Sequence, residues 1–88
     1  MADLKAQFAQ AQTDVSSLTK RPSNEDFLFL YAHFKQANGG DAKGDRPGML
    51  DMVGRAKYDA WAKLKGVKPE QAMQKYVDKV TALLKTHK

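Results

Sequence analysis

A tyrosine and a lysine share one face of a strongly apolar segment near the middle of the chain. The segment reads NEDFLFLYAHFKQAN from Asn24 to Asn38 and has the pattern of a helix. In a helix, Tyr31 and Lys35 stand four positions apart, so that a phenol and an ammonium project side by side from an apolar surface. Such a pair suits a ligand that is anionic at one end and apolar elsewhere. Alternatively, Lys35 lies at the edge of the core and extends its charge into water.

The same predicted helix is apolar on two sides. Phe27, Leu28 and Phe34 join Tyr31 on one side, while Phe29 lies toward the other. This is more apolar surface than a helix can bury when it packs on one side only. We expect one face to enter a bundle core and the other to be covered by another helix, a partner or an apolar ligand.

Two residues in the second half of the chain stand within apolar stripes. Lys57 projects from the stripe of a predicted helix, where an unpaired ammonium is costly to desolvate, so it reaches either an anion or the solvent edge. Tyr76 stands at the centre of another stripe and is either an ordinary core tyrosine or part of a pocket wall. Trp61 is predicted to belong to the core rather than to a site.

The chain offers little for catalysis. His33 and His87 are its only histidines, and His33 points away from the face that carries Tyr31. The spacing indicates no pair of acids, no serine and histidine pair and no HExxH motif. With no cysteine, the chain has neither a disulfide nor a thiolate metal site. We therefore expect a binding protein rather than an enzyme, with no metal and no cofactor.

Length and charge bound the remaining possibilities. Eighty-eight residues make one domain, near the size at which a single core suffices. Fifteen Lys and Arg against ten Asp and Glu give a net charge of +5, which favours anionic partners. The basic residues are scattered and no recognition motif is present, so nucleic acid is not the expected partner. No apolar run is long enough for a signal peptide or a membrane span, and we expect a soluble cytoplasmic protein.

Helix signals recur along the whole chain. Asp3 is placed to cap a first helix, and Ser23 to cap the apolar one. A third helix is predicted from about Met52 to Lys65, ended by Gly66, and a fourth begins at Pro69. No segment alternates with a period of two for long enough to form a sheet. The sequence therefore predicts an all-α bundle of four helices.

A long loop is predicted between the second and third helices. Five of the six glycines lie between positions 39 and 54, and they match no phosphate-binding motif, so we interpret them as turn formers. A loop of this length is unusual in a compact domain. We expect Met49, Leu50 and Met52 to hold its second half against the core.

Two stretches resemble one known family. They are YAHFKQA at Tyr31–Ala37 and DRPGMLDMVGRAKYDAWAKLKG at Asp45–Gly66, and the chain is similar to the acyl-CoA-binding protein family from about Phe8 through Leu83. The resemblance implies an up-down-down-up four-helix bundle in a single acyl-CoA-binding domain, residues 1–88. It also implies a monomeric intracellular carrier and pool former for long-chain acyl-CoA esters, of about C14 to C22, that bury many methylenes. The resemblance further implies that any contact with membranes is transient. It also implies that enzymes that use acyl-CoA are possible partners.

The resemblance also implies roles for individual residues. Tyr31, Lys35 and Lys57 match the family residues that hold the 3′-phosphate and adenine end of coenzyme A. Phe34 matches an aromatic residue that stacks on the base, and Tyr76 matches a tyrosine that contacts the ligand. We further expect the two lysines to repel each other without ligand, so that replacing either one leaves stability level or raises it.

Other positions match the lining of the ligand groove. These are Gln12, Phe27 and Leu28. The sequence departs from the family where Gln12 replaces a common alanine, and where Ser16 and Val53 replace common basic residues near the expected head group. Fewer positive charges there should weaken affinity for an anionic ligand.

Two alternatives belong to other functional classes. A basic helical module could bind a protein or nucleic acid through the face that carries Tyr31. A thioesterase is the weaker alternative, because no nucleophile or base is placed for it.

Overall fold

Residues 3–87 are described by the computed structural model and contain four α-helices. These are α1 (Leu4–Ser16), α2 (Asn24–Gly39), α3 (Met52–Ala62) and α4 (Pro69–Thr86). No strand occurs within this range, so the predicted all-α class is confirmed.

Local capping sets where the helices begin. The Asp3 carboxylate accepts a hydrogen bond from the backbone N–H of Ala6 at 2.8 Å, and the Ser23 hydroxyl accepts one from Asp26 at 3.2 Å. Pro69 occupies the first turn of α4. The predicted starts are therefore confirmed.

The end of α3 differs from the prediction, because the helix stops at Ala62 rather than at Lys65. The next backbone N–H groups bond three residues back, Leu64 to Trp61 at 2.9 Å and Lys65 to Ala62 at 3.2 Å, which tightens the last turn out of α-helical geometry. Gly66 then reverses the chain with a φ of +88°, as its predicted terminator role requires.

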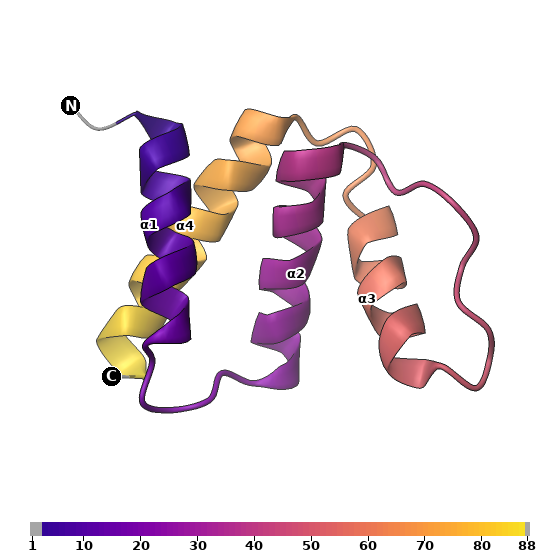
Figure 1. Cartoon of the computed structure of the whole chain (residues 1–88), viewed down its shortest axis with the longest axis horizontal. Helices are drawn as coiled ribbons and strands as arrows, with labels where there is room; N and C mark the ends of the chain where they lie inside the picture. Colours follow the sequence, from indigo (N-terminus) through magenta and orange to yellow (C-terminus); the bar gives the residue numbers. More distant parts are fainter. Residues whose placement is uncertain (1–2, 88) are drawn as a thin grey trace.

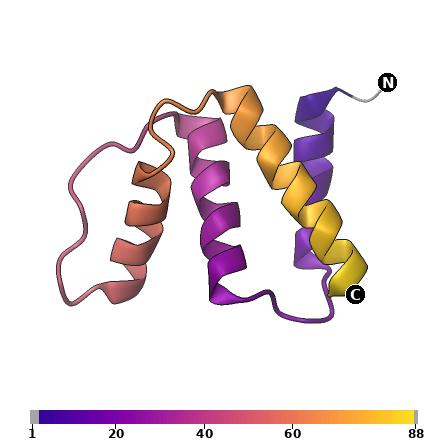
Figure 2. The same cartoon turned by 180° about the vertical axis from the view of Figure 1, so that it is seen from behind.

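The helices run in the predicted up-down-down-up order. In Figure 1, α1 and α4 run in one direction and α2 and α3 in the other. Within residues 3–87, α1 and α2 each pack against α4, and α3 packs against α2 without approaching α1 or α4. Figure 2 shows the same row of helices from behind. The third helix is therefore an outer element attached to a three-helix core.

Aromatic rings from three helices meet in that core. The ring centres of Phe8 in α1 and Tyr76 in α4 lie 5.0 Å apart, and the two rings meet edge to face. Phe34 of α2 lies 6.1 Å from Phe8 and 6.4 Å from Tyr76. The cluster continues through Val80 and Leu83, whereas α3 contributes no buried side chain.

A buried amide joins the two ends of the α3 region to α2. Gln36 is fully buried, and its Nε2 donates to the Asp41 carboxylate at 2.9 Å and to the Val67 carbonyl at 2.8 Å. Asp41 also accepts from the Gly66 N–H at 2.8 Å, and these bonds lower the pKa of its carboxyl. The loop before α3 and the turn after it are thereby fixed to the same point.

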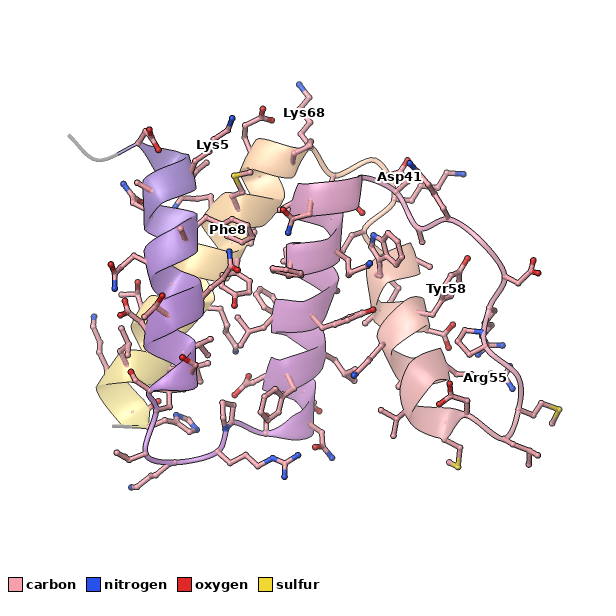
Figure 3. All side chains as sticks on the ribbon, in the orientation of Figure 1. Lys5, Phe8, Asp41, Arg55, Tyr58 and Lys68 are labelled. Atoms are coloured by element: carbon pink, nitrogen blue, oxygen red, sulfur yellow. The ribbon has the colours of Figure 1, made fainter. Side chains whose placement is uncertain are left out.

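The second half of the α2–α3 loop is not held against the core, contrary to the prediction. Met49, Leu50 and Met52 expose 80%, 101% and 78% of their surface. Polar contacts with the outer side of α3 anchor the first half instead. The Tyr58 hydroxyl donates to the Gly44 carbonyl at 2.9 Å (Figure 3), and Arg46 pairs with Asp59 at 2.6 Å. The apolar residues lie beyond the last of these anchors.

Candidate functional site

A groove of about 580 Å³ lies between α2 and α3. It exists because the second apolar face of α2 is covered only by α3, a short helix that packs on no other helix of the described chain. Its walls are mainly aromatic and aliphatic, with cations at the edges. The lining residues are Arg21, Asn24, Phe27, Leu28, Tyr31, Met52, Val53, Ala56 and Lys57.

A smaller hollow of about 290 Å³ adjoins the groove. The backbones of α1 and α2 do not approach each other, so the hollow lies between them and is closed by the aromatic core. Its lining residues are Val15, Ser16, Pro22, Phe27, Leu30, Tyr31, Phe34 and Tyr76. Phe27 and Tyr31 line both spaces, so the groove and the hollow are neighbours that share one aromatic wall.

Two lysines lie over aromatic rings across the α2–α3 contact. The ammonium of Lys57 in α3 lies 5.3 Å from the centre of the Tyr31 ring in α2. Conversely, the ammonium of Lys35 in α2 lies 4.8 Å from the centre of the Trp61 ring in α3. A cation over an aromatic face stabilises by about 0.5–1 kcal/mol at exposed sites. The sequence suggested that removing either lysine leaves stability level or raises it, whereas these ring contacts favour a small loss.

Arg21 is a further cation that lines the groove but not the smaller hollow. The Arg21 guanidinium lies 5.3 Å from the centre of the Phe27 ring, and Phe27 lines groove and hollow alike. Apolar walls with cations at the rim match a ligand that carries an anionic group and an apolar chain.

Most of the sequence-predicted binding residues come together here. Tyr31 and Phe27 line both spaces, Leu28 and Lys57 line the groove, and three residues line the smaller hollow, namely Ser16, Phe34 and Tyr76.

Two predicted residues lie elsewhere. Gln12 turns its amide back along α1, where it donates to the Phe8 carbonyl at 3.4 Å, and it lines neither space. Lys35 is directed to Trp61 and is also absent from both linings. Trp61 is only half-buried and donates from Nε1 to the Gly40 carbonyl at 2.8 Å, so it supports a loop and a lysine as well as the packing of α3.

The groove also contains residues that sequence reasoning did not assign to a site. Arg21 and Asn24 flank the start of α2, and Met52 and Ala56 belong to the first turns of α3. The α3 stripe was visible as an apolar pattern. However, the pattern does not show whether a protein helix or a ligand covers it.

Tyr76 is both a core tyrosine and part of a pocket wall, the two interpretations that its position in the sequence left open. Its side chain is buried against Phe8, and it also lines the smaller hollow. Burial raises the pKa of its phenol, so Tyr76 stays neutral at physiological pH.

His33 lies on the other side of α2, as expected. Its side chain is buried, its ring stacks on Phe29 with 4.1 Å between ring centres, and its Nδ1 lies 2.7 Å from the Phe29 carbonyl. Burial lowers the pKa of His33. The histidine therefore has a structural role.

Two other kinds of feature are absent from residues 3–87. No group of three or more His, Cys, Asp or Glu could hold a metal ion there. None of the described helices has the length and apolar character needed to cross a membrane.

Comparisons with known proteins agree on one family. The family model described as "Acyl CoA binding protein" matches residues 5–80. An acyl-CoA-binding protein homolog of Drosophila melanogaster is 51% identical over 78 residues, covering 89% of this chain and 91% of that protein. The crystal structure of Oryza sativa acyl-CoA-binding protein 2 aligns with a TM-score of 0.89 and 38% identity, over 93% of this chain and 89% of that one. The crystal structure of the Moniliophthora perniciosa protein aligns with a TM-score of 0.87 and 42% identity. This alignment covers 99% of this chain and 84% of that one.

Proposed function

The chain belongs to the acyl-CoA-binding protein family, and from this membership we propose that it binds long-chain fatty acyl-CoA esters, of about C14 to C22, with high affinity. In this proposal residues 1–88 form one acyl-CoA-binding domain that acts as a monomeric cytoplasmic carrier and pool former. The observation that carries the proposal is the pair of neighbouring spaces, one with mainly apolar walls and cations at its edge and one with aromatic walls.

The larger groove suits the acyl chain. Phe27, Leu28, Met52, Val53 and Ala56 give it aliphatic and aromatic walls. Burying about a dozen methylenes at about 0.8 kcal/mol each supplies on the order of 10 kcal/mol before ordering costs. Nanomolar affinity needs about 12 kcal/mol, so the acyl chain requires help from the other end of the ligand.

The smaller hollow and the lysines suit the nucleotide end. Phe34 offers a ring face for the adenine, since bases stack on aromatic side chains, and the buried Tyr76 forms part of the wall of the same hollow. Lys57 lies beside Tyr31, where the two spaces meet, and can donate charge-assisted bonds to a phosphate. We propose that Lys35 joins it there by exchanging the Trp61 ring for the ligand.

A carrier with no chemistry of its own fits these residues. The two spaces are lined by no histidine or carboxylate, and the two tyrosines and one serine in their linings have no adjacent base there. The alternative of a basic module that binds protein or nucleic acid through α2 is not favoured, because α2 packs on α4 and α3 and the remaining face forms the groove.

Calorimetry tests the proposal by separating the two ends of the ligand. Palmitoyl-CoA should bind at least roughly a hundredfold tighter than coenzyme A or palmitate, because only the joined ligand gains both contributions. Equal affinity for palmitate and its CoA ester would contradict it. A short DNA duplex serves as the control for charge alone, and tightest binding to the duplex would support the basic module instead.

A further inference from the structure

One backbone hydrogen bond within residues 3–87 joins two segments that are remote in the sequence. The N–H of Lys20, in the link between α1 and α2, donates to the carbonyl of His87 at the end of α4, at 3.0 Å. The other backbone hydrogen bonds outside the regular helices of this range span only three or four residues. The Thr19 hydroxyl donates to the same carbonyl at 3.3 Å. We call these two bonds the C-terminal latch.

The latch lies where α1 and α2 are joined. The backbones of α1 and α2 do not approach each other, whereas each of these helices packs on α4. Figures 1 and 2 both show the last turn of α4 beside the α1–α2 link. The latch therefore fixes this link to the one helix that α1 and α2 both contact.

The link and the residues next to it form walls of the candidate site. Pro22 in the link is buried and lines the smaller hollow, together with Val15 and Ser16 at the end of α1. The opposite wall of this hollow belongs to α2 and includes Tyr31. The position of the link therefore sets how far the α1 wall of the hollow stands from the α2 wall.

Packing alone does not fix the middle of the link. Leu18 packs on the core and Pro22 is buried, whereas Thr19 and Lys20 between them are exposed. An exposed stretch with little apolar contact opens easily unless hydrogen bonds hold it in one conformation. The latch supplies two such bonds. A link that is held in place before the ligand arrives reduces the ordering cost of binding.

We propose that His87 is a positioning residue for ligand binding, because its backbone carbonyl holds the α1–α2 link on α4 and so keeps the smaller hollow preformed for the nucleotide end of the ligand. The nature of the ligand rests on the proposed function. His87 lines neither the groove nor the hollow, so its effect on the ligand passes through the link. Its imidazole takes no part in the latch, since Nδ1 lies 2.6 Å from the Thr86 hydroxyl.

Two C-terminal deletions test the latch. Deletion of Lys88 alone keeps the acceptor oxygen of His87, whereas deletion of residues 87 and 88 removes it. In calorimetry, the shorter deletion should bind palmitoyl-CoA as the wild type does. The longer deletion should bind it about three- to tenfold more weakly, because two hydrogen bonds that preform the hollow are gone.

Substitutions provide matched controls. His87→Ala keeps the backbone carbonyl and should bind as the wild type does. Thr19→Val removes one donor and should weaken binding roughly twofold, whereas Thr19→Ser keeps a hydroxyl and should restore the affinity. Thr19→Val leaves the end of α4 intact, so it tests the latch even where the longer deletion destabilises that helix. Combined with the longer deletion, it should cause no further loss, because both changes act through the same carbonyl.

The dependence on acyl-chain length separates positioning of the hollow from a general loosening of the fold. The apolar walls of the larger groove come from α2 and α3, which the latch bonds do not touch. Myristoyl-CoA and palmitoyl-CoA should therefore both bind more weakly to the longer deletion, while the ratio of their affinities stays as in the wild type. A smaller ratio would show that the groove is disturbed too, and would give His87 a general structural role instead.

Two further results would overturn the latch proposal. They are wild-type affinity in the longer deletion, and an equal loss of affinity in His87→Ala. An equal loss after deletion of Lys88 alone would likewise assign the effect to the lysine charge. Absence of palmitoyl-CoA binding by the wild type would refute the proposed function and this role with it, whereas wild-type binding that the longer deletion leaves unchanged would refute the latch alone.

Discussion

The ammonium of Lys57 in α3 lies 5.3 Å from the centre of the Tyr31 ring in α2. The reciprocal contact joins Lys35 of α2 to Trp61 of α3 at 4.8 Å. The contact between α2 and α3 that creates the groove therefore also sets where Lys57, at the groove, and Lys35, outside it, stand before a ligand arrives. Cations held over rings rather than paired with carboxylates stay available to an anionic ligand, because a ring attracts them only weakly.

Removing either lysine should weaken acyl-CoA binding. We expect Lys35→Ala and Lys57→Ala each to cost about 1.5 to 3 kcal/mol, as charge-assisted bonds do, when measured by calorimetry with palmitoyl-CoA. Because both lysines are proposed to hold the 3′-phosphate, the losses should be non-additive and should nearly vanish for 3′-dephospho-CoA esters. Full additivity, or equal losses with the dephosphorylated ligand, would show that the lysines do not share one phosphate.

Ligand-free stability should respond to the same substitution in α3. Lys57→Ala removes a cation from the Tyr31 ring and should lower the free energy of unfolding by about 0.5–1 kcal/mol. Urea denaturation of the variant without ligand measures the change. Lys5→Ala in α1 is the control, since Lys5 is exposed and should have little effect. Stability that rises in Lys57→Ala would mean that charge repulsion outweighs the ring contact.

A positive charge at position 16 should strengthen binding. Ser16 lines the smaller hollow, so Ser16→Lys should tighten palmitoyl-CoA binding by up to roughly 1 kcal/mol at low salt and by less at high salt. Ser17→Lys is the matched control, because Ser17 is the next residue, is exposed and lines neither space. A gain of equal size at both positions would indicate general attraction rather than a local contact with the ligand.

Stability should fall in mild acid because of His33. Burial lowers the pKa of His33 in the folded state, with a further lowering by Lys75, whereas the unfolded chain has the usual pKa of about 6.5. The unfolded state therefore binds more protons, and this stability contribution is fully present above about pH 6.5 and lost as pH falls through the folded-state pKa.

The His33→Gln variant tests this assignment. Its stability curve, from urea denaturation between about pH 7.5 and 5, should be flatter than that of the wild type, because the titrating group is gone. The carboxyl of Asp26 does not titrate between about pH 7.5 and 5, because its hydrogen bond with Lys79 lowers its pKa below the usual value of an aspartate. Parallel curves for the two proteins would assign the acid sensitivity to another group.

Local interactions explain why the sequence alone determined the helices. A cap such as Ser23 and a terminator such as Gly66 act on backbone groups only a few residues away, so their effect can be recognised from spacing. The apolar stripes likewise follow from a helical period that needs no knowledge of the partner. The motif around Tyr31 and Lys57 was sufficient to indicate the family.

Only the tertiary structure decided which of those side chains meet. Whether an apolar residue is buried depends on a second element covering it, and no sequence pattern shows that Leu50 stays uncovered while Leu30 is enclosed. In the same way, Lys35 and Lys57 look equivalent in sequence, but the crossing of α2 and α3 sends one to Trp61 and the other to Tyr31. Such contacts join residues more than 20 positions apart, and packing between helices sets them rather than local backbone preference.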